Sequence, residues 1–159
     1  DASCESDLTE LVKSRMEGYK KMGVGATAPD FTVRDNDGNL FTLSQMSAPL
    51  TLVMFWSSTC GHCREMMPGL KELYLENSSP EFEVLAISID STATLYESYL
   101  AEEPMPWISV YESQGWQGLL ASRYQIYATP SFFLVDRDRT IISRPSNVRQ
   151  LQRSLQKLR

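Results

Sequence analysis

The chain has 159 residues, 42% of them hydrophobic, and a formal net charge of −5 at pH 7. This length and apolar content suffice for one hydrophobic core, so we expect one domain with short appendages. An acidic chain lacks the electrostatic attraction that holds nucleic acid or an anionic membrane surface, so neither is expected as a partner. No apolar run approaches membrane-spanning length, and the first residues have neither the basic nor the apolar segment of a signal peptide.

The first regular pattern covers about residues 7 to 22, where apolar side chains recur at helical spacing. Asp7 followed by Glu10 resembles a capping box, so we predict a helix that begins at Asp7 and ends before Gly23. Its apolar stripe needs a surface to pack on, either in this domain or in an upstream one. We therefore divide the chain into a helical extension, residues 1–24, which is the remnant of an upstream domain or a tether, and a main domain, residues 25–159.

Strands and helices alternate through the main domain. A hairpin is predicted for residues 31–43, and the continuous apolar run at 50–56 predicts a central strand buried on both faces, followed by a helix from Cys60. The remaining predicted elements are strands at 82–89, 107–111, 131–135 and 140–142, helices at 92–103 and 114–124, and a last helix that Asn147 caps, with Leu151, Leu155 and Leu158 facing inward. This order predicts an α/β fold, a mixed sheet with helices on both faces.

Two of the three cysteines form one Cys-x-x-Cys unit, Cys60 and Cys63, and leave Cys4 unpaired near the N-terminus. Two cysteines three apart at a helix start lie on the same face of its first turn, so their sulfurs can form a reversible disulfide. The free N–H groups and the positive end of the helix dipole favour a thiolate at Cys60, so we expect its pKa below that of free cysteine. His62 is the only histidine, and when protonated it would favour the thiolate further.

The expected chemistry is thiol–disulfide exchange. Reduced Cys60 attacks a substrate disulfide, and Cys63 then attacks Cys60 to release the reduced product. An external electron donor must restore the dithiol, and the same residues run backward would oxidise substrate thiols. A closed zinc site would need four ligands, and only His62 and the remote Cys4 could join the pair. We therefore expect no metal and no cofactor other than the redox-active disulfide.

The segment from Trp56 to Pro68 resembles the Phe-Trp-x-x-x-Cys-x-x-Cys-x-x-x-x-Pro motif of the thioredoxin superfamily, closest to its TlpA/ResA-like thiol–disulfide oxidoreductases. Residues 25–31 resemble the opening of that branch and of peroxiredoxins, and residues 128–134 resemble the thioredoxin cis-proline loop and its strand. The resemblance covers about residues 25–158. It implies a thioredoxin fold, with an N-terminal β-hairpin and a strand–helix insertion at about 83–111.

The same resemblance implies roles for individual residues. Cys60 and Cys63 would be catalytic, with Gly61 and His62 tuning the thiolate. The residues that would bind substrate are Thr129, Pro130 and Trp56. In this family the proline equivalent to Pro130 is cis, faces the cysteines and keeps metal off the thiolates.

The resemblance also implies a setting. Members of this branch are mostly bacterial extracytoplasmic reductants, so we expect a periplasmic protein, tethered to the membrane through a preceding segment. Its partners would be protein thiols and disulfides and an electron donor such as a membrane thiol–disulfide relay. The Cys-Gly-His-Cys tetrapeptide also resembles the active site of protein disulfide isomerases, so an isomerase or oxidase is an alternative to the reductant.

Three positions depart from the family pattern. Thr59 replaces the tryptophan that usually precedes the first cysteine, which removes apolar surface beside the disulfide. Met54 and Met66 stand where relatives keep proton-handling acids, and we interpret both methionines as core residues. Deprotonation of Cys63 would then need water or Glu65.

Two rival functions are weaker. A peroxidase of the peroxiredoxin class would need a Pro-x-x-x-Thr-x-x-Cys signature, but Val53 and Ser57 occupy its first two key places. A thioredoxin-fold metal-binding module, such as a copper chaperone, is disfavoured by the Cys-x-x-Cys unit together with Pro130.

Overall fold

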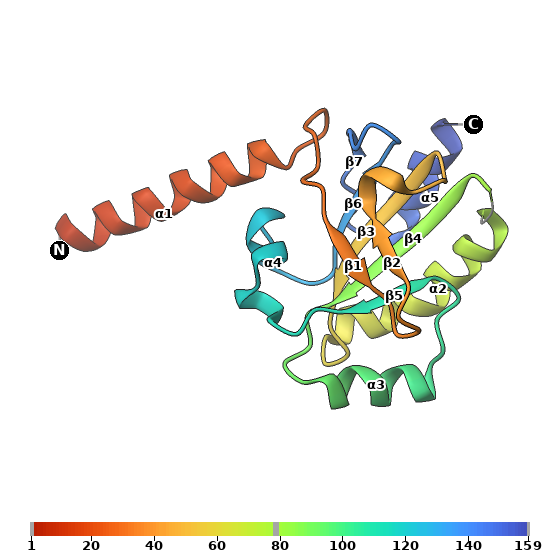
Figure 1. Ribbon diagram of the computed structural model, residues 1–159. Helices are drawn as coiled ribbons and strands as arrows, with labels where there is room; N and C mark the ends of the chain where they lie inside the picture. The colour runs from red at the N-terminus through yellow and green to blue at the C-terminus, as the bar shows by residue number, and fades with distance from the viewer. Residues whose placement is uncertain (1, 78–79, 159) are drawn as a thin grey trace.

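The computed structural model describes residues 2–77 and 80–158, with side chains from residue 6 onward except at position 19. The side chain of Cys4 therefore lies outside the described part. A five-stranded sheet forms the centre of the molecule (Figure 1). Its strands, in spatial order, are β5 (Ile108–Tyr111), β4 (Phe82–Ser88), β3 (Leu50–Trp56), β6 (Ser131–Val135) and β7 (Ile141–Ser143).

The sheet is mixed, as the sequence predicts. Strand β3 pairs in parallel with β4, and β4 with β5, whereas β3 pairs antiparallel with β6 and β6 with β7. The carboxyl ends of β3, β4 and β5 therefore meet at one edge, and the amino end of β6 joins them there. This edge is where Cys60 and the loop before β6 come together.

Helices cover both faces of the sheet, and β3 is buried between them. One face packs against α2 (Gly61–Asn77), α3 (Ala93–Glu102) and α5 (Val148–Lys157), with Leu52, Met54 and Trp56 of β3 in that core. Val53 and Phe55 point to the other face, which α4 (Leu119–Arg123) covers. All five side chains have no exposed surface, which explains why this strand is apolar without alternation.

A separate two-stranded sheet forms the predicted hairpin. Strands β1 (Thr32–Arg34) and β2 (Leu40–Thr42) pair antiparallel, and a single-turn helix η1 (Leu43–Gln45) follows. The carboxylate of Asp35 accepts hydrogen bonds from the backbone of Asp37 and Asn39, and Gly38 takes a φ of 87° that favours glycine.

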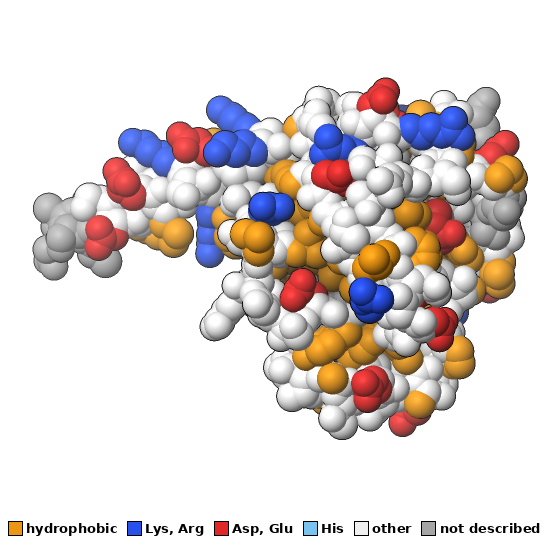
Figure 2. Space-filling model, in the orientation of Figure 1, with side chains coloured by type: hydrophobic (Ala, Val, Ile, Leu, Met, Phe, Trp, Pro, Cys, Tyr) orange, Lys and Arg blue, Asp and Glu red, His pale blue; other side chains and the backbone are white. Residues whose placement is uncertain are grey.

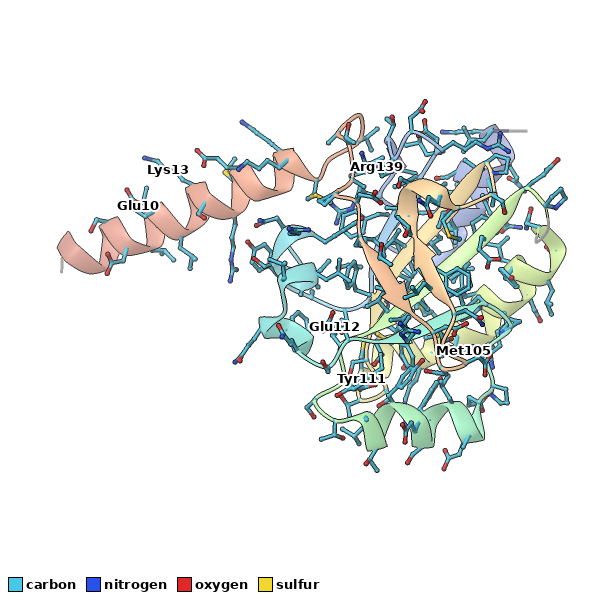
Figure 3. The ribbon with its side chains drawn as sticks, viewed as in Figure 1. Glu10, Lys13, Met105, Tyr111, Glu112 and Arg139 are labelled. Atoms are coloured by element: carbon cyan, nitrogen blue, oxygen red, sulfur yellow. The ribbon has the colours of Figure 1, made fainter. Side chains whose placement is uncertain are left out.

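The insertion places α3 against the sheet edge at β5. Figure 3 shows Tyr111 of β5 between that strand and α3, and its ring stacks on Tyr96 at 5.5 Å between centroids. Tyr96 and Tyr99 of α3 also pack on Trp56 of β3. Aromatic contacts therefore fix α3 beside the end of the central strand.

Helix α1 (Ala2–Lys21) extends away from the body of the molecule (Figures 1 and 2). The predicted helix is present, but it begins five residues before Asp7, so the predicted capping box is wrong. Figure 3 shows Glu10 and Lys13 on the stretch that stands clear of the body. The apolar stripe is 48 to 61% exposed at Leu8, Leu11, Val12 and Met16.

Among the described side chains, those in the second half of α1 and just after it contact the main domain. The guanidinium of Arg15 lies 5.1 Å from the ring centroid of Tyr127, and Met22 is 3% exposed. Gly18 lies so close to Gln125 that an added Cβ would stand 2.5 Å from the amide oxygen of that side chain. The glycine therefore permits the close approach of helix and loop.

Two further predictions need correction. The predicted helix over 114–124 consists of a single turn, η2 (Gly115–Gln117), and α4, because Gly118 between them is extended, with a ψ of 157°. An added Cβ on Gly118 would lie 3.2 Å from the carbonyl oxygen of Gly115, so no larger residue fits there without movement. Leu158 does not face inward but is 50% exposed, because α5 ends at Lys157.

No helix in the described part of the chain combines the length and apolar character needed to cross a membrane.

Candidate active site

The two cysteines lie where β3 gives way to α2. Strand β3 ends at Trp56, residues 57–59 form a turn, and the amide of Cys60 donates to the carbonyl of Ser57 at 3.2 Å. The helical hydrogen bonds begin at once, because the amide of Arg64 donates to the carbonyl of Cys60 at 3.1 Å. Cys60 therefore precedes the first helical residue, as the sequence predicts.

Both cysteines are free thiols with different environments. Cys60 is partly exposed, whereas Cys63 is fully buried. The backbone amide of Cys63 donates to the sulfur of Cys60 at 3.1 Å. One of the unsatisfied amides at the helix N-terminus thus points at the outer sulfur, where it stabilises negative charge.

The loop before β6 faces this sulfur. The antiparallel pairing of β3 and β6 brings the Thr129–Pro130 peptide bond, which is cis, to the same edge of the sheet. The thiol of Cys60 donates to the carbonyl oxygen of Thr129 at 3.5 Å. Residues 69 positions apart in the chain therefore form one surface.

The surroundings shift the two thiols in opposite directions. Partial burial raises the pKa of Cys60, but hydrogen bonds from the Cys63 thiol, the Thr129 side chain and the amides of Cys63 and His62 outweigh it, and the pKa lies below its ordinary value. Burial raises the pKa of Cys63 to about 12, and the hydrogen bond and negative charge of Cys60 act in the same direction. As pH rises, Cys60 therefore loses its proton before Cys63 does.

The two residues between the cysteines, Gly61 and His62, have few contacts with the sulfurs in the structure. His62 is exposed, and its contribution to lowering the pKa of Cys60 comes from its backbone amide. Gly61 is also exposed, and an added Cβ there would meet no atom within 4 Å. Packing therefore does not require a glycine at this position.

Trp56 is not a surface residue, so the expectation that it contacts substrate is wrong. Its side chain has no exposed surface and packs on two tyrosines of α3, because the end of β3 is covered by the insertion. Met54 is buried in the same core, as expected. Glu65 is exposed, and no described hydrogen bond joins it to Cys63.

One acid beside the cysteine loop was missed by the sequence analysis. Asp90 follows β4, is 1% exposed and lies against the turn at residues 57–59. Its carboxylate accepts hydrogen bonds from the hydroxyls of Ser57, Ser58 and Ser88 and from the amide of Ser58, at 2.7 to 2.8 Å. The signal was present, because Asp90 and Ser57 each follow a buried strand and neighbouring parallel strands end at one edge.

A hollow of about 410 Å³ lies between the cysteine loop and α3. Its lining includes Thr59, Gly61, Arg64, Leu95, Tyr99 and Glu102. Arg64 donates through Nε to the carbonyl of Ser58 at 2.6 Å, and its guanidinium lies 5.2 Å from the ring centroid of Tyr99. The small side chain of Thr59 contributes one wall of this hollow.

The described residues contain no group of three or more histidine, cysteine and acidic side chains arranged to hold a metal ion.

Comparison with known proteins decides the family. The sequence model of the AhpC/TSA family matches residues 24–144. The chain belongs to the AhpC/TSA family. Within that family it is similar to the thiol–disulfide oxidoreductase ResA of Bacillus thuringiensis, with 25% identity over 130 residues that cover 79% of this chain and 73% of ResA.

Solved structures give the fold of this AhpC/TSA member. The thioredoxin domain of a thiol–disulfide oxidoreductase from Bacteroides vulgatus superposes with a TM-score of 0.77 at 24% identity, covering 86% of this chain and 97% of that one. A thioredoxin-like protein from Bacteroides caccae reaches a TM-score of 0.80 at 22% identity, covering 96% of this chain and 56% of its own. The predicted thioredoxin fold and the resemblance to ResA-like proteins are confirmed, and the chain is a thiol–disulfide oxidoreductase.

Proposed function

We propose that this enzyme reduces disulfides in protein substrates through the Cys60–Cys63 dithiol. The observation that carries the proposal is the asymmetry of the pair, an accessible thiol whose pKa is lowered and a buried one whose pKa is raised to about 12. A nucleophile must be ionised and reachable, whereas the second thiol must stay protonated until it is needed.

The first step is attack by the Cys60 thiolate on one sulfur of the substrate disulfide. A bond forms between Cys60 and that sulfur, the substrate disulfide breaks, and the other substrate sulfur leaves as a thiolate. The backbone of Thr129, beside the cis peptide bond, would pair with the substrate chain and hold it next to Cys60. Pro130 would shape the same groove.

The second step is attack by Cys63 on Cys60. In the mixed disulfide Cys60 has no charge, so two of the effects that raise the pKa of Cys63 vanish. The proton of Cys63 passes to water or to the departing substrate thiolate. Cys63 then bonds to Cys60, the second substrate sulfur leaves, and two electrons have passed from the dithiol to the substrate.

The setting of the reaction rests on the resemblance to the TlpA/ResA-like branch. We propose an extracytoplasmic, periplasmic enzyme whose disulfide is returned to the dithiol by an external donor, such as a membrane thiol–disulfide relay. Residues 1–24 would be an extension that links the catalytic domain, residues 25–159, to a further segment. The solved relative from Bacteroides caccae is longer than the matched part, which covers 56% of it, so such a domain occurs beside a further segment in that protein.

The direction of electron flow is tested by the reduction potential of the Cys60–Cys63 pair. We expect a value near that of thioredoxin, about −270 mV, and insulin reduction that Cys60→Ser abolishes. In Cys63→Ser the mixed disulfide should accumulate on Cys60 and identify the substrate. A potential near about −120 mV would overturn the reductant and favour the oxidase or isomerase.

A peroxidase is the alternative that the family name raises, and the same protein tests it. Ser57 occupies the signature threonine position, and its hydroxyl donates to Asp90 at 2.8 Å. We therefore expect slow peroxide turnover beside fast insulin reduction. Peroxide turnover faster than disulfide reduction would replace the proposal.

A further inference from the structure

The buried acid next to the active site, Asp90, has no part in the exchange steps above. Its carboxylate is 1% exposed, and four groups donate to it. Three donors belong to the turn at residues 57–59, which precedes Cys60. They are the Ser57 hydroxyl and the amide and hydroxyl of Ser58, all at 2.8 Å from Oδ1. Only the fourth, the Ser88 hydroxyl at 2.7 Å from Oδ2, lies outside it.

These bonds fix the turn on its inner side, and other bonds fix its outer side. The Ser57 hydroxyl also accepts from the amide of Thr59 at 3.3 Å, and the Ser58 carbonyl accepts from Arg64. The Ser57 carbonyl receives the amide of Cys60. Every polar group of Ser57 and Ser58 named here is thus engaged, immediately before the cysteine.

Asp90 itself has little freedom to move. Its own amide donates to the Ser88 hydroxyl at 3.1 Å, and the amide of Ile89 donates to the carbonyl of Trp56 at 2.9 Å. On the other side lies Gly115, whose φ is 52° and where an added Cβ would stand 3.2 Å from the Ile89 carbonyl. The acid is therefore attached to the sheet and not to a flexible loop.

We propose that Asp90 is a positioning residue, which holds the 57–59 turn so that the sulfur of Cys60 stays aligned with the amide of Cys63 and with Thr129. The inference rests on the proposed role of Cys60 as the attacking thiol. Hydrogen bonds to a carboxylate are shorter and stronger than those between neutral groups, and three of them on one oxygen make the turn stiff. Hydrogen-bond donors stabilise the negative charge of a thiolate only while they point at its sulfur.

The charge of Asp90 cannot be what activates Cys60, because a negative charge opposes a thiolate. This contrast separates two roles by experiment. If Asp90 acts through its hydrogen bonds, an amide in its place still offers an oxygen with two lone pairs to the donors of the turn and keeps most of the restraint. If it acts through its charge, the amide and alanine variants should behave alike.

The test is the pH dependence of Cys60 alkylation by iodoacetamide, measured in a parent that carries Cys4→Ser and Cys63→Ser, so that Cys60 is the one remaining thiol. The groups that bond to the sulfur of Cys60 are the His62 amide, Thr129 and the residue at position 63, and all are common to the variants. We expect Asp90→Ala to raise the midpoint and to lower the rate at pH 7 by about tenfold, which equals one pKa unit. Asp90→Asn should stay within about threefold of the parent, since its amide oxygen keeps the acceptor.

A second pair of variants keeps the test valid if Asp90→Ala fails to fold. The double variant Ser57→Ala and Ser58→Ala removes two of the three bonds to the turn while the acid stays, and should raise the midpoint in the same direction. Ser88→Ala is the matched control, because it removes a donor of the carboxylate without touching the turn, and it should leave the midpoint in place.

Failure of this inference differs from failure of the proposed function. If the parent reacts no faster than an unfolded cysteine peptide, the proposed role of Cys60 fails. If the parent is fast but the double variant leaves the midpoint unchanged, or Asp90→Asn shifts it as Asp90→Ala does, the positioning role of Asp90 is overturned.

Discussion

At the scale of single residues, the site gives its two cysteines different reactivities. Cys60 and Cys63 are three positions apart, but one sulfur lies at the open end of a helix and the other inside the core. Burial alone would raise both pKa values, and fixed hydrogen bonds reverse the direction at Cys60. The side chain of Thr129 contributes to lowering the pKa of each thiol, which the resemblance did not imply.

Selective alkylation follows from this difference. With a trace of iodoacetamide at pH 7, Cys60 should be modified at least about a hundredfold faster than Cys63, because the thiolate fractions differ by more than two pKa units. Mass spectrometry of the digested protein measures both adducts. Equal labelling of the two cysteines in the folded, reduced protein would contradict the assignment of the nucleophile.

Replacing Thr129 by valine tests the side-chain hydrogen bond without changing the β-branched shape. The pKa of Cys60 should rise, and its alkylation at pH 7 should slow by about three- to tenfold, the worth of one hydrogen bond. Thr129→Ser, which keeps the hydroxyl, is the control. If valine and serine give the same pH profile, the hydroxyl does not stabilise the thiolate.

At the scale of elements, α1 differs from the other helices. Its apolar stripe is exposed, and its described contacts with the main domain begin at Arg15, so most of the stripe lies on no packing surface in the described structure. The helices on the sheet are different, because each buries apolar side chains against β3 and β4. The stability of the fold therefore comes from the sheet and its covering helices.

Matched substitutions on two helices test this contrast. Leu11→Ser in α1 should change the free energy of unfolding by less than about 0.5 kcal/mol, because the side chain is 49% exposed. Leu70→Ala in α2 should cost about 2 to 5 kcal/mol, because it leaves a cavity in the core. Urea denaturation measures both, and a large loss in Leu11→Ser would show that α1 is packed in solution.

At the scale of the whole molecule, buried tyrosines make the fold sensitive to alkaline pH. Burial raises the pKa of Tyr74 and of Tyr96 to about 12, and it raises the pKa of Tyr124 further. In the unfolded chain these phenols lose their protons near pH 10. The folded state therefore binds more protons above that pH, so its stability is complete below about pH 10 and declines as pH rises toward 12.

The urea midpoint measured between pH 8 and pH 12 checks this expectation. The triple variant Cys4→Ser, Cys60→Ser and Cys63→Ser removes all three thiols, so that a decline above about pH 10 is due to the tyrosines. Tyr74→Phe should make the urea midpoint fall less steeply with pH, because it removes one phenol whose pKa is raised in the folded state. The hydrogen bond to Glu83 that it also removes is partly buried. A midpoint that stays constant to pH 12 would contradict these pKa shifts.

Local patterns sufficed to predict the strands, most helices and the position of the cysteines. The apolar run at 50–56 and the helical pattern after it depend only on neighbouring residues, so the strand–turn–helix unit with Cys60 at the helix start could be predicted without tertiary contacts. The predictions failed where packing overrides pattern, at Gly118, which interrupts a helix, and at Leu158, which lies beyond one.

The sequence by itself thus determined that a Cys-x-x-Cys pair would stand at a helix N-terminus after a buried strand, because spacing and periodicity are local properties. Only the tertiary structure decided which groups surround that pair. Thr129 reaches Cys60 through the antiparallel pairing of β6 with β3, and Asp90 reaches Ser57 through the parallel pairing of β4 with β3. Strand pairing between distant segments, not the motif, therefore places the groups that lower the pKa of Cys60 and the core that raises the pKa of Cys63.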